Sequence, residues 1–507
     1  MILCFSFVEL LALTAVYAYA WFHVYFERVS YRLNFYPGGL GHRGTIAIYF
    51  FLLLFAMQTY GGGGLGSERS SKMILSQFFG ILFANFITYL QLCLMSMWMV
   101  RIVPMIIMSI VQMVVALVFL AVYEAGYRRF VMPKSLLLIY GEYPIESILE
   151  KLGSRGDRFK VEKCMGISEG MEAIEAELQP GCNDHGKARA DGRDSAEERG
   201  GAYDAVVLWD LPNKERNDLL KLCYGSGIRV YLMPKITDVI IKGMTPLHFF
   251  DTPIFMAREY PLKLEERVAK RALDLVCSLI LGILTSPFML LTALAVKLYD
   301  GGPVLYKQTR VTLGNKEFQI LKFRSMSVSA EADGVARLAG KQDARITPVG
   351  RFIRSCRLDE LPQLWNIFKG EMSFVGPRPE RPELIKKYME EMPEFAFRTR
   401  VKAGLAGYAQ IYGKYNTTPY DKLKLDLYYI ENYSFWLDLQ LMLLTPKILL
   451  TPESTEGVSE NPGKSGVLAE KAEGSASGGA LTEKTVMGSG GTARETTPAG
   501  ENVRETA

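Results

Sequence analysis

Four long apolar runs dominate the first 125 residues of the chain. They cover residues 1–26, 45–60, 74–100 and 102–123. Each is close to the roughly 17–25 residues that a helix needs to cross a bilayer, although the second is short and Glu9 interrupts the first. We therefore expect a bundle of four membrane-spanning helices over residues 1–125. The connecting segments carry five basic residues on one side against four on the other, which favours a cytoplasmic location for the rest of the chain.

Residues 133–255 alternate between strand-like and helix-like segments. The strand-like segments read SLLLIYG, DAVVLWD and IRVYLMP, and the helix-like segments read PIESILEKLG and NKERNDLLKLCYGSG. This alternation predicts a Rossmann-like, nucleotide-fold-like α/β domain with a small parallel sheet. A dinucleotide site needs G-x-G-x-x-G after the first strand, but the turn here reads GEYP (residues 141–144). We therefore do not expect NAD binding, and we interpret the polar insert at about 178–201 as a surface loop.

A fifth apolar segment covers residues 271–299 and has two interpretations. On hydropathy alone it is another membrane-spanning helix. However, Ser286-Pro287 lies in its middle, and proline removes a backbone donor and kinks a helix. Each half has about 12–15 residues, which is too short to cross a bilayer alone. A helix broken at this proline would enter and leave by the same face, and the residues leave both interpretations open.

Basic residues outnumber acidic ones by eleven to six between positions 301 and 360. This excess favours an anionic ligand such as a phosphate, although a surface facing lipid headgroups would also be basic. Arg351, Arg354 and Arg357 recur every three residues, so a helix through them would display one basic stripe. The adjacent acids Asp359 and Glu360 follow directly.

Asp359 has a structural and a chemical interpretation. Pro362 fits the first turn of a helix, which would make Asp359 an N-cap or first-turn residue. Alternatively, a carboxylate is the candidate nucleophile, because the last histidine of the chain is His248 and no histidine base can serve this region. Neighbouring arginines would lower the pKa of such a carboxylate and neutralise a diphosphate, and a divalent ion would bridge carboxylate and phosphate oxygens.

From Lys270 to about residue 450, the chain resembles the bacterial sugar transferase family, the monotopic polyprenyl-phosphate phosphoglycosyl transferases. The matching segments occur in family order and are KRALDL (270–275), Ser286-Pro287, GGPVLYKQTRVT (301–312), FQILKFRSM (318–326), ITPVGRFIRSCRLDELPQLWNIFKGEMSFVGPRPE (346–380), KAGLAGYAQIYG (402–413) and DLYYIENYSFWLDLQLMLLT (426–445). Four apolar runs followed by an α/β domain resemble the large family members that initiate exopolysaccharide and capsule synthesis. One departure is AGLAG at 403–407, where the family often has Pro-Gly-Ile-Thr-Gly.

The resemblance implies an α/β catalytic domain over residues 263–451 whose segment 271–299 is a re-entrant membrane helix broken at Ser286-Pro287. It implies transfer of sugar-1-phosphate from a UDP-sugar to undecaprenyl phosphate, with release of UMP. Asp359 would carry the sugar phosphate covalently, Glu360 would support the metal or the deprotonation of the acceptor, and both would be ligands of Mg2+. The substrate-binding residues that it implies are Lys322, Arg324, Arg354, Pro377, Arg378 and Pro379.

The resemblance also places the enzyme in the bacterial inner membrane as a multi-pass protein, with its catalytic domain on the cytoplasmic face. A net charge of +4 is too slight to indicate nucleic acid, and seven dispersed cysteines without a CxxC pair argue against a zinc site. Later glycosyltransferases, export machinery or a second copy of the chain are compatible partners. Two other functions stay open, namely an inactive scaffold for polysaccharide assembly and an NAD-dependent nucleotide-sugar dehydratase or epimerase. Residues 452–507 read as a disordered tail.

Overall fold

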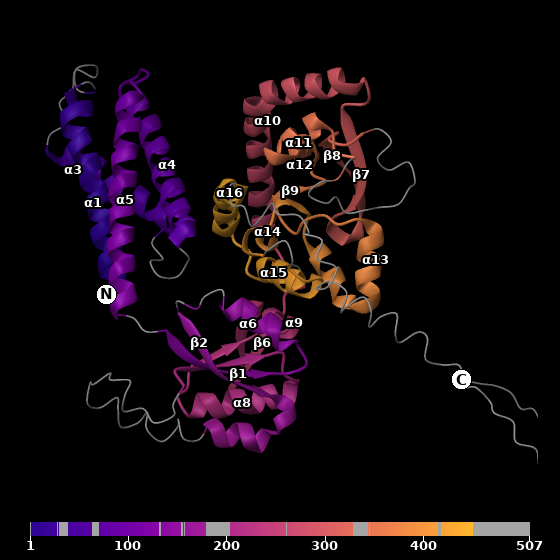
Figure 1. The fold of residues 1–507 in the computed structure, drawn as a ribbon. Coiled ribbons are helices and arrows are strands. Elements are labelled where there is room, and N and C mark those ends of the chain that lie inside the picture. Colours follow the sequence, from indigo (N-terminus) through magenta and orange to yellow (C-terminus); the bar gives the residue numbers. More distant parts are fainter. Residues whose placement is uncertain are drawn as a thin grey trace, which may run out of the picture. The chain divides into compact units, whose positions relative to one another are not determined.

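A computed structural model of the protein is shown in Figure 1. It describes residues 2–27, 29, 39–62, 70–130, 133–153, 156, 158–178, 203–259, 261–327, 343, 345–413 and 417–449. Residues 452–507, expected to form a tail, lie outside the described residues, as does the polar insert apart from its first residue.

All four N-terminal apolar runs form helices, as predicted. The helices are α1 (Ile2–Ala20), which continues through the wide turn η1 (Trp21–Tyr25), α3 (Gly39–Tyr60), α4 (Ser70–Met95) and α5 (Val103–Phe130). Helix α4 ends before its apolar run does, because Met97 adopts a left-handed backbone conformation (φ 49°) that a helix cannot continue through. Together with α10, described below, five helices of the described residues are long and apolar enough to cross a membrane.

The polar residues inside these apolar helices contact one another. Tyr49 donates a hydrogen bond to Asn85 (2.8 Å), Asn85 donates to Gln112 (2.8 Å), and Gln112 donates back to the Tyr49 hydroxyl (2.7 Å). Gln77 donates to Glu9 at 2.6 Å. Because an unpaired polar group is costly in lipid, these pairs explain how Glu9 and its polar neighbours are accommodated in the bundle.

The middle region contains the predicted parallel sheet. The predicted strands and helices are β1 (Lys134–Tyr140), α6 (Ile145–Gly153), β3 (Ala205–Trp209), α8 (Asn213–Gly225) and β4 (Val230–Leu232). The strand β2 (Phe159–Gly166), the short turn η2 (Ile167–Glu169), the helix α9 (Ile236–Gly243) and the hairpin of β5 (Thr245–Phe249) and β6 (Thr252–Met256) were not predicted. The four parallel strands are in the order β2-β1-β3-β4, so the buried strands β1 and β3 are central and β2 and β4 are at the edges.

The turn after β1 lies against the end of β3. The backbone amide of Gly141 donates to the carbonyl of Trp209 at 3.1 Å, and a side chain at position 141 would overlap the carbonyl of Asp210. Glycine is therefore needed here because two backbone segments approach each other closely. The glycine of this turn has a structural reason that does not involve a phosphate.

Helix α10 (Leu264–Asp300) contains Pro287 and covers the whole fifth apolar segment. Figure 1 shows this helix turning sharply within its length. Thr285 and Ser286 donate hydrogen bonds to the carbonyls of Leu281 and Ile283, at 2.7 and 2.8 Å. A proline together with such side-chain bonds to the preceding turn is a known cause of helix bending. The predicted break at Ser286-Pro287 therefore takes the form of a bend in one helix.

The remaining elements form a compact α/β region around two small sheets. Its strands are β7 (Leu305–Val311), antiparallel to β8 (Glu317–Phe323), and β9 (Ser373–Val375), parallel to β10 (Gly404–Ala406). Its helices and turns are η4 (Leu313–Asn315), α11 (Pro348–Ser355), η5 (Leu358–Glu360), α12 (Gln363–Lys369), α13 (Pro382–Glu391), η6 (Pro393–Arg400), α14 (Tyr408–Tyr412), α15 (Pro419–Glu431) and α16 (Phe435–Leu449).

The first half of α10 is bound to this region by buried polar contacts. Lys270 donates to Asp438 (2.6 Å) and to the carbonyl of Val375 (2.8 Å). Asp274 accepts hydrogen bonds from the hydroxyl of Ser373 and the backbone amide of Phe374, both at 2.9 Å. In the second half of α10, Val296 belongs to an apolar cluster against which Leu358 of η5 packs. The apolar helix therefore contacts both β9 and the turn that carries the acid pair.

Candidate active site

The acid pair lies in a single helical turn between two short helices. Helix α11 begins at Pro348, and the side chain of Thr347 caps it by accepting a hydrogen bond from the Gly350 amide at 2.9 Å. It ends at Ser355, and Arg357 then adopts a left-handed conformation (φ 56°). Asp359 and Glu360 follow in η5. The expectation of one helical stripe of arginines through Arg357 is therefore wrong, because α11 ends before Arg357 and this residue has a non-helical backbone conformation.

Asp359 is 7% exposed, and its Oδ1 atom is buried without a hydrogen-bond partner. It does not cap the helix that follows, since the N-cap of α12 is Pro362. Burial, and then the charge of Glu360, raise the pKa of Asp359 above its usual range, while Lys322, Arg354 and Arg357 oppose this shift. A buried carboxylate oxygen that no protein group satisfies, in cationic surroundings, is available to a ligand.

Glu360 is in the opposite condition, because three cations surround one of its oxygens. Lys322 and Arg378 each donate a hydrogen bond to its Oε1 atom at 3.3 Å, and Arg357 forms an ion pair with the same atom at 3.5 Å. Burial raises the pKa of Glu360, but the combined charges of Arg378, Lys322 and Arg357 outweigh burial and lower this pKa to about 2. Glu360 is therefore ionised at neutral pH and holds the three cations beside Asp359.

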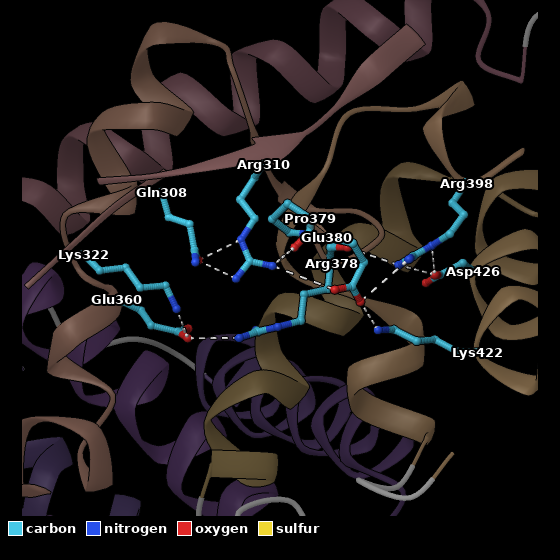
Figure 2. A network of polar contacts seen from close by, with 10 residues as sticks. All are labelled: Gln308, Arg310, Lys322, Glu360, Arg378, Pro379, Glu380, Arg398, Lys422 and Asp426. Carbon is cyan, nitrogen blue, oxygen red and sulfur yellow. Dashed lines mark hydrogen bonds and ion pairs between the residues drawn. The ribbon is translucent and has the colours of Figure 1, made fainter. Parts of the chain in front are cut away.

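The Pro-Arg-Pro segment supplies one of these cations. Figure 2 shows Arg378 extending toward Glu360, with Lys322 on the other side of that carboxylate. Pro377 and Pro379 flank Arg378 just after β9. Of the residues expected to bind substrate, the structure thus brings Lys322 and Arg378 to the acid pair, while the contacts of Pro377 and Pro379 are with the Gly404 amide and Arg310.

The two other arginines of the expected set have different surroundings. The Nη1 atom of Arg354 is buried without a hydrogen-bond partner, and its charge acts on Asp359. Arg324 instead forms a two-pronged ion pair with Asp300 and donates from Nε to the carbonyl of Pro303 at 2.7 Å. Arg354 is therefore available to an anion at the acid pair, whereas Arg324 fastens the end of α10 to the strand β8.

A second layer of charged residues lies behind the Pro-Arg-Pro segment and was not predicted. Figure 2 shows it as a network of ion pairs and hydrogen bonds that continues from Glu380. Its charged members are Arg310, Glu380, Arg398, Lys422 and Asp426. Glu380 follows Pro379 directly in the sequence, but that position alone does not reveal its pairing with Lys422 and Arg398. A shallow hollow beside this layer is lined by Thr312, Pro377, Arg378, Glu380, Arg398 and Ala403, among others.

The acid pair is also where a divalent ion would have to bind. Within the described residues, no group of three or more histidine, cysteine, aspartate or glutamate side chains could hold a metal ion. Mg2+ needs less than this, because it commonly binds one or two carboxylates together with substrate phosphates and water. The unsatisfied Oδ1 atom of Asp359 fits that requirement, whereas the Oε1 atom of Glu360 is already shared by three cations.

Comparisons with known proteins bear on the same part of the chain. The model of the family described as bacterial sugar transferase matches residues 265–452. A UDP-glucose:undecaprenyl-phosphate glucose-1-phosphate transferase of Caulobacter vibrioides is 42% identical over 190 residues, which are 36% of this chain and 71% of that protein. The chain therefore belongs to the bacterial sugar transferase family.

Two further relatives match a longer part of this chain than the Caulobacter protein does. The UDP-N-acetylgalactosamine-undecaprenyl-phosphate N-acetylgalactosaminephosphotransferase of Aeromonas hydrophila is 37% identical over 256 residues, or 49% of this chain and 59% of that protein. The undecaprenyl-phosphate glucose phosphotransferase of Komagataeibacter xylinus is 38% identical over 255 residues, which are 48% of each chain. The matched part of this chain thus spans about half to three-fifths of the length of these two relatives.

Proposed function

We propose that this protein transfers a sugar-1-phosphate from a UDP-sugar to undecaprenyl phosphate and releases UMP. The observation that carries the proposal is the contrast within the acid pair. Asp359 keeps a buried oxygen without a partner, while Glu360 holds Lys322, Arg357 and Arg378 beside it. Family membership and the activities that the relatives' names state support the same reaction.

In this proposal Asp359 is the nucleophile. Its carboxylate attacks the phosphorus that bears the sugar, a phosphorus–oxygen bond to Asp359 forms, and the bond to the departing UMP breaks. The phosphate oxygen of undecaprenyl phosphate then attacks the same phosphorus and releases Asp359. Such a covalent step divides one difficult displacement into two easier ones.

The cations around the acid pair supply the electrostatic part of catalysis. Lys322, Arg354 and Arg378 would bind the diphosphate and stabilise the negative charge that it gains during transfer. Of the two expected Mg2+ ligands, Asp359 would hold the ion through its unpartnered Oδ1 atom, since the Oε1 atom of Glu360 is already shared by three cations; the bound ion would supply further charge neutralisation at the diphosphate.

A membrane-associated site suits the two substrates, since one is water-soluble and the other is a lipid. The second half of α10 packs against η5, so an apolar helix lies next to the turn that carries Asp359. We propose that α10 enters and leaves the bilayer by the cytoplasmic face of the inner membrane, while α1, α3, α4 and α5 span it. The lipid phosphate and the UDP-sugar would then meet on one side.

The test is UMP release by the full-length protein in lipid nanodiscs that contain undecaprenyl phosphate and Mg2+. Each of several UDP-sugars is offered, including UDP-glucose and UDP-N-acetylgalactosamine, the donors that the names of the relatives suggest. We expect release with at least one donor and none with a folded Asp359→Asn variant. Equal release by that variant would disprove the role of Asp359. No release with any donor would favour a membrane scaffold without catalysis.

A further inference from the structure

The backbone of the Pro-Arg-Pro-Glu segment (residues 377–380) is held through its carbonyl groups. Proline has no backbone N–H, so Pro377 and Pro379 cannot donate hydrogen bonds. Instead, four consecutive carbonyls accept hydrogen bonds from four separate donors. The carbonyls of residues 377, 378, 379 and 380 accept from the Gly404 amide (2.9 Å), Arg398 Nη2 (3.1 Å), Arg310 Nη1 (3.1 Å) and the Val311 amide (3.1 Å).

Arg398 provides the bond that acts on the middle of this segment. Its side chain is 4% exposed, and it donates to the backbone carbonyl of Arg378, whose own side chain reaches Glu360. Asp426, which is 1% exposed, accepts a hydrogen bond from Arg398 Nε at 2.8 Å, and the same carboxylate oxygen forms an ion pair with Nη2 at 2.8 Å. Asp426 therefore fixes the direction in which Arg398 points.

The side chain of Glu380 lies among the cations that surround this segment. It pairs with Lys422, and it lies 3.8 Å from both Arg398 and Arg310. Arg398 is thus held by the buried Asp426, and Arg310 lies beside the partly exposed Glu380. Two nitrogens of the rigid, planar Arg398 guanidinium, Nε and Nη2, contact the same Asp426 oxygen, which restricts the orientation of the guanidinium more than one contact would.

We infer that Arg398, oriented by Asp426, is a positioning residue for Arg378. It does not meet the substrate in this account, but it determines where the Arg378 guanidinium lies relative to Glu360 and Asp359. The inference rests on the proposed function, because it needs Arg378 to act on the transferred phosphate. Displacing a catalytic group by about 1 Å can cost on the order of a hundredfold in rate, so a contact behind the site can matter.

The experiment uses the double variant Arg398→Met/Asp426→Leu in the full-length protein. Exchanging a buried ion pair for apolar residues is often neutral or stabilising, so this variant is expected to fold, and Glu380 keeps Lys422 and Arg310 as partners. Arg400→Gln is the matched control, since Arg400 lies in the same turn η6 but binds the backbone of residues 258 and 259. UMP release is measured for both, and for each combined with Arg378→Ala.

We expect the double variant to lose about tenfold to a hundredfold in kcat/KM for the UDP-sugar, with a melting temperature close to that of the wild type. When Arg378 is already alanine, the same double change should cost less than about threefold, because residues that act through one another are not additive. The control should change nothing in either background. If the double variant does not fold, Arg398→Lys keeps the charge but cannot reach Asp426 and the carbonyl together, and the same comparison applies.

Three results would overturn the inference. The first is a folded variant with kcat/KM within about twofold of the wild type, and the second is a loss that persists fully in the Arg378→Ala background. In both cases an active wild type leaves the proposed function intact. The third is an Arg378→Ala variant as active as the wild type, which removes only the inference. A wild type that releases no UMP with any donor is a different outcome, because it removes the proposed function and the inference with it.

Discussion

Replacing Glu360 by glutamine removes the negative charge that Lys322, Arg357 and Arg378 share. The pKa of Glu360 falls from 4.5 to about 2 on folding, and its side chain is 12% exposed, so little solvent screens the interaction. A shift of about 2.5 units corresponds to roughly 3 kcal/mol, because each unit is worth about 1.4 kcal/mol. The free energy of unfolding at pH 7 is therefore expected to fall by about 3 kcal/mol in Glu360→Gln.

The sign of the pH dependence follows from the lowered pKa. The stabilisation by ionised Glu360 is fully present above the unfolded pKa of 4.5, and it is lost as the pH falls through the folded value of about 2. The difference between wild type and variant should shrink to roughly half near pH 3. Denaturant unfolding in nanodiscs, followed by tryptophan fluorescence at both pH values, measures this. A difference that is the same at pH 7 and pH 3, or below about 0.5 kcal/mol at pH 7, would refute the reasoning.

Three further predictions concern α10 and the pH dependence of the reaction. Lys270→Met leaves Asp438 buried without the cation that donates to it at 2.6 Å, so the free energy of unfolding, measured by thermal unfolding, should fall by about 3–5 kcal/mol. The same change at an exposed lysine of α13 is the control and should leave this free energy unchanged. Because the pKa of Asp359 is raised, the rate of UMP release should fall on acidification at a higher pH than for an ordinary aspartate; a flat profile down to about pH 4 would contradict this. In a cysteine-free background, single cysteines that replace Glu265 or Leu305 should both react with an impermeant maleimide from the same side of the membrane. Labelling of the two positions from opposite sides would mean that α10 spans the membrane.

Local patterns predicted most of the elements and missed those whose pattern is weak. The apolar runs of the bundle and the buried strands β1 and β3 were predicted because length and hydrophobicity identify such segments. The strand β2 reads FKVEKCMG and is at the edge of its sheet, so its charged residues concealed it. The basic stripe failed at Arg357, where a single left-handed residue ends the periodicity that a sequence pattern assumes.

The site residues likewise divide into those that the sequence revealed and those that only the structure revealed. The acid pair stands out in the sequence itself, and Lys322 and Arg378 could be named because they lie in segments that resemble the family. The second layer could not, because its contacts join positions far apart in the chain. Arg398 reaches 28 residues forward to Asp426 and 20 residues back to the Arg378 carbonyl. Helical and strand periodicities report only near neighbours, so tertiary ion pairs of this kind need the folded structure.

The central claim is that Asp359 carries the sugar phosphate, and intact-protein mass spectrometry tests it most directly. The full-length protein is incubated with its active UDP-sugar and Mg2+ but without undecaprenyl phosphate, and the wild type is compared with Asp359→Asn. We predict a wild-type mass increase of one sugar phosphate that peptide mapping places on Asp359, that is absent from the variant, and that undecaprenyl phosphate removes. An unmodified wild type that nevertheless releases UMP as soon as the lipid is added, or a modification on another residue, would contradict the account.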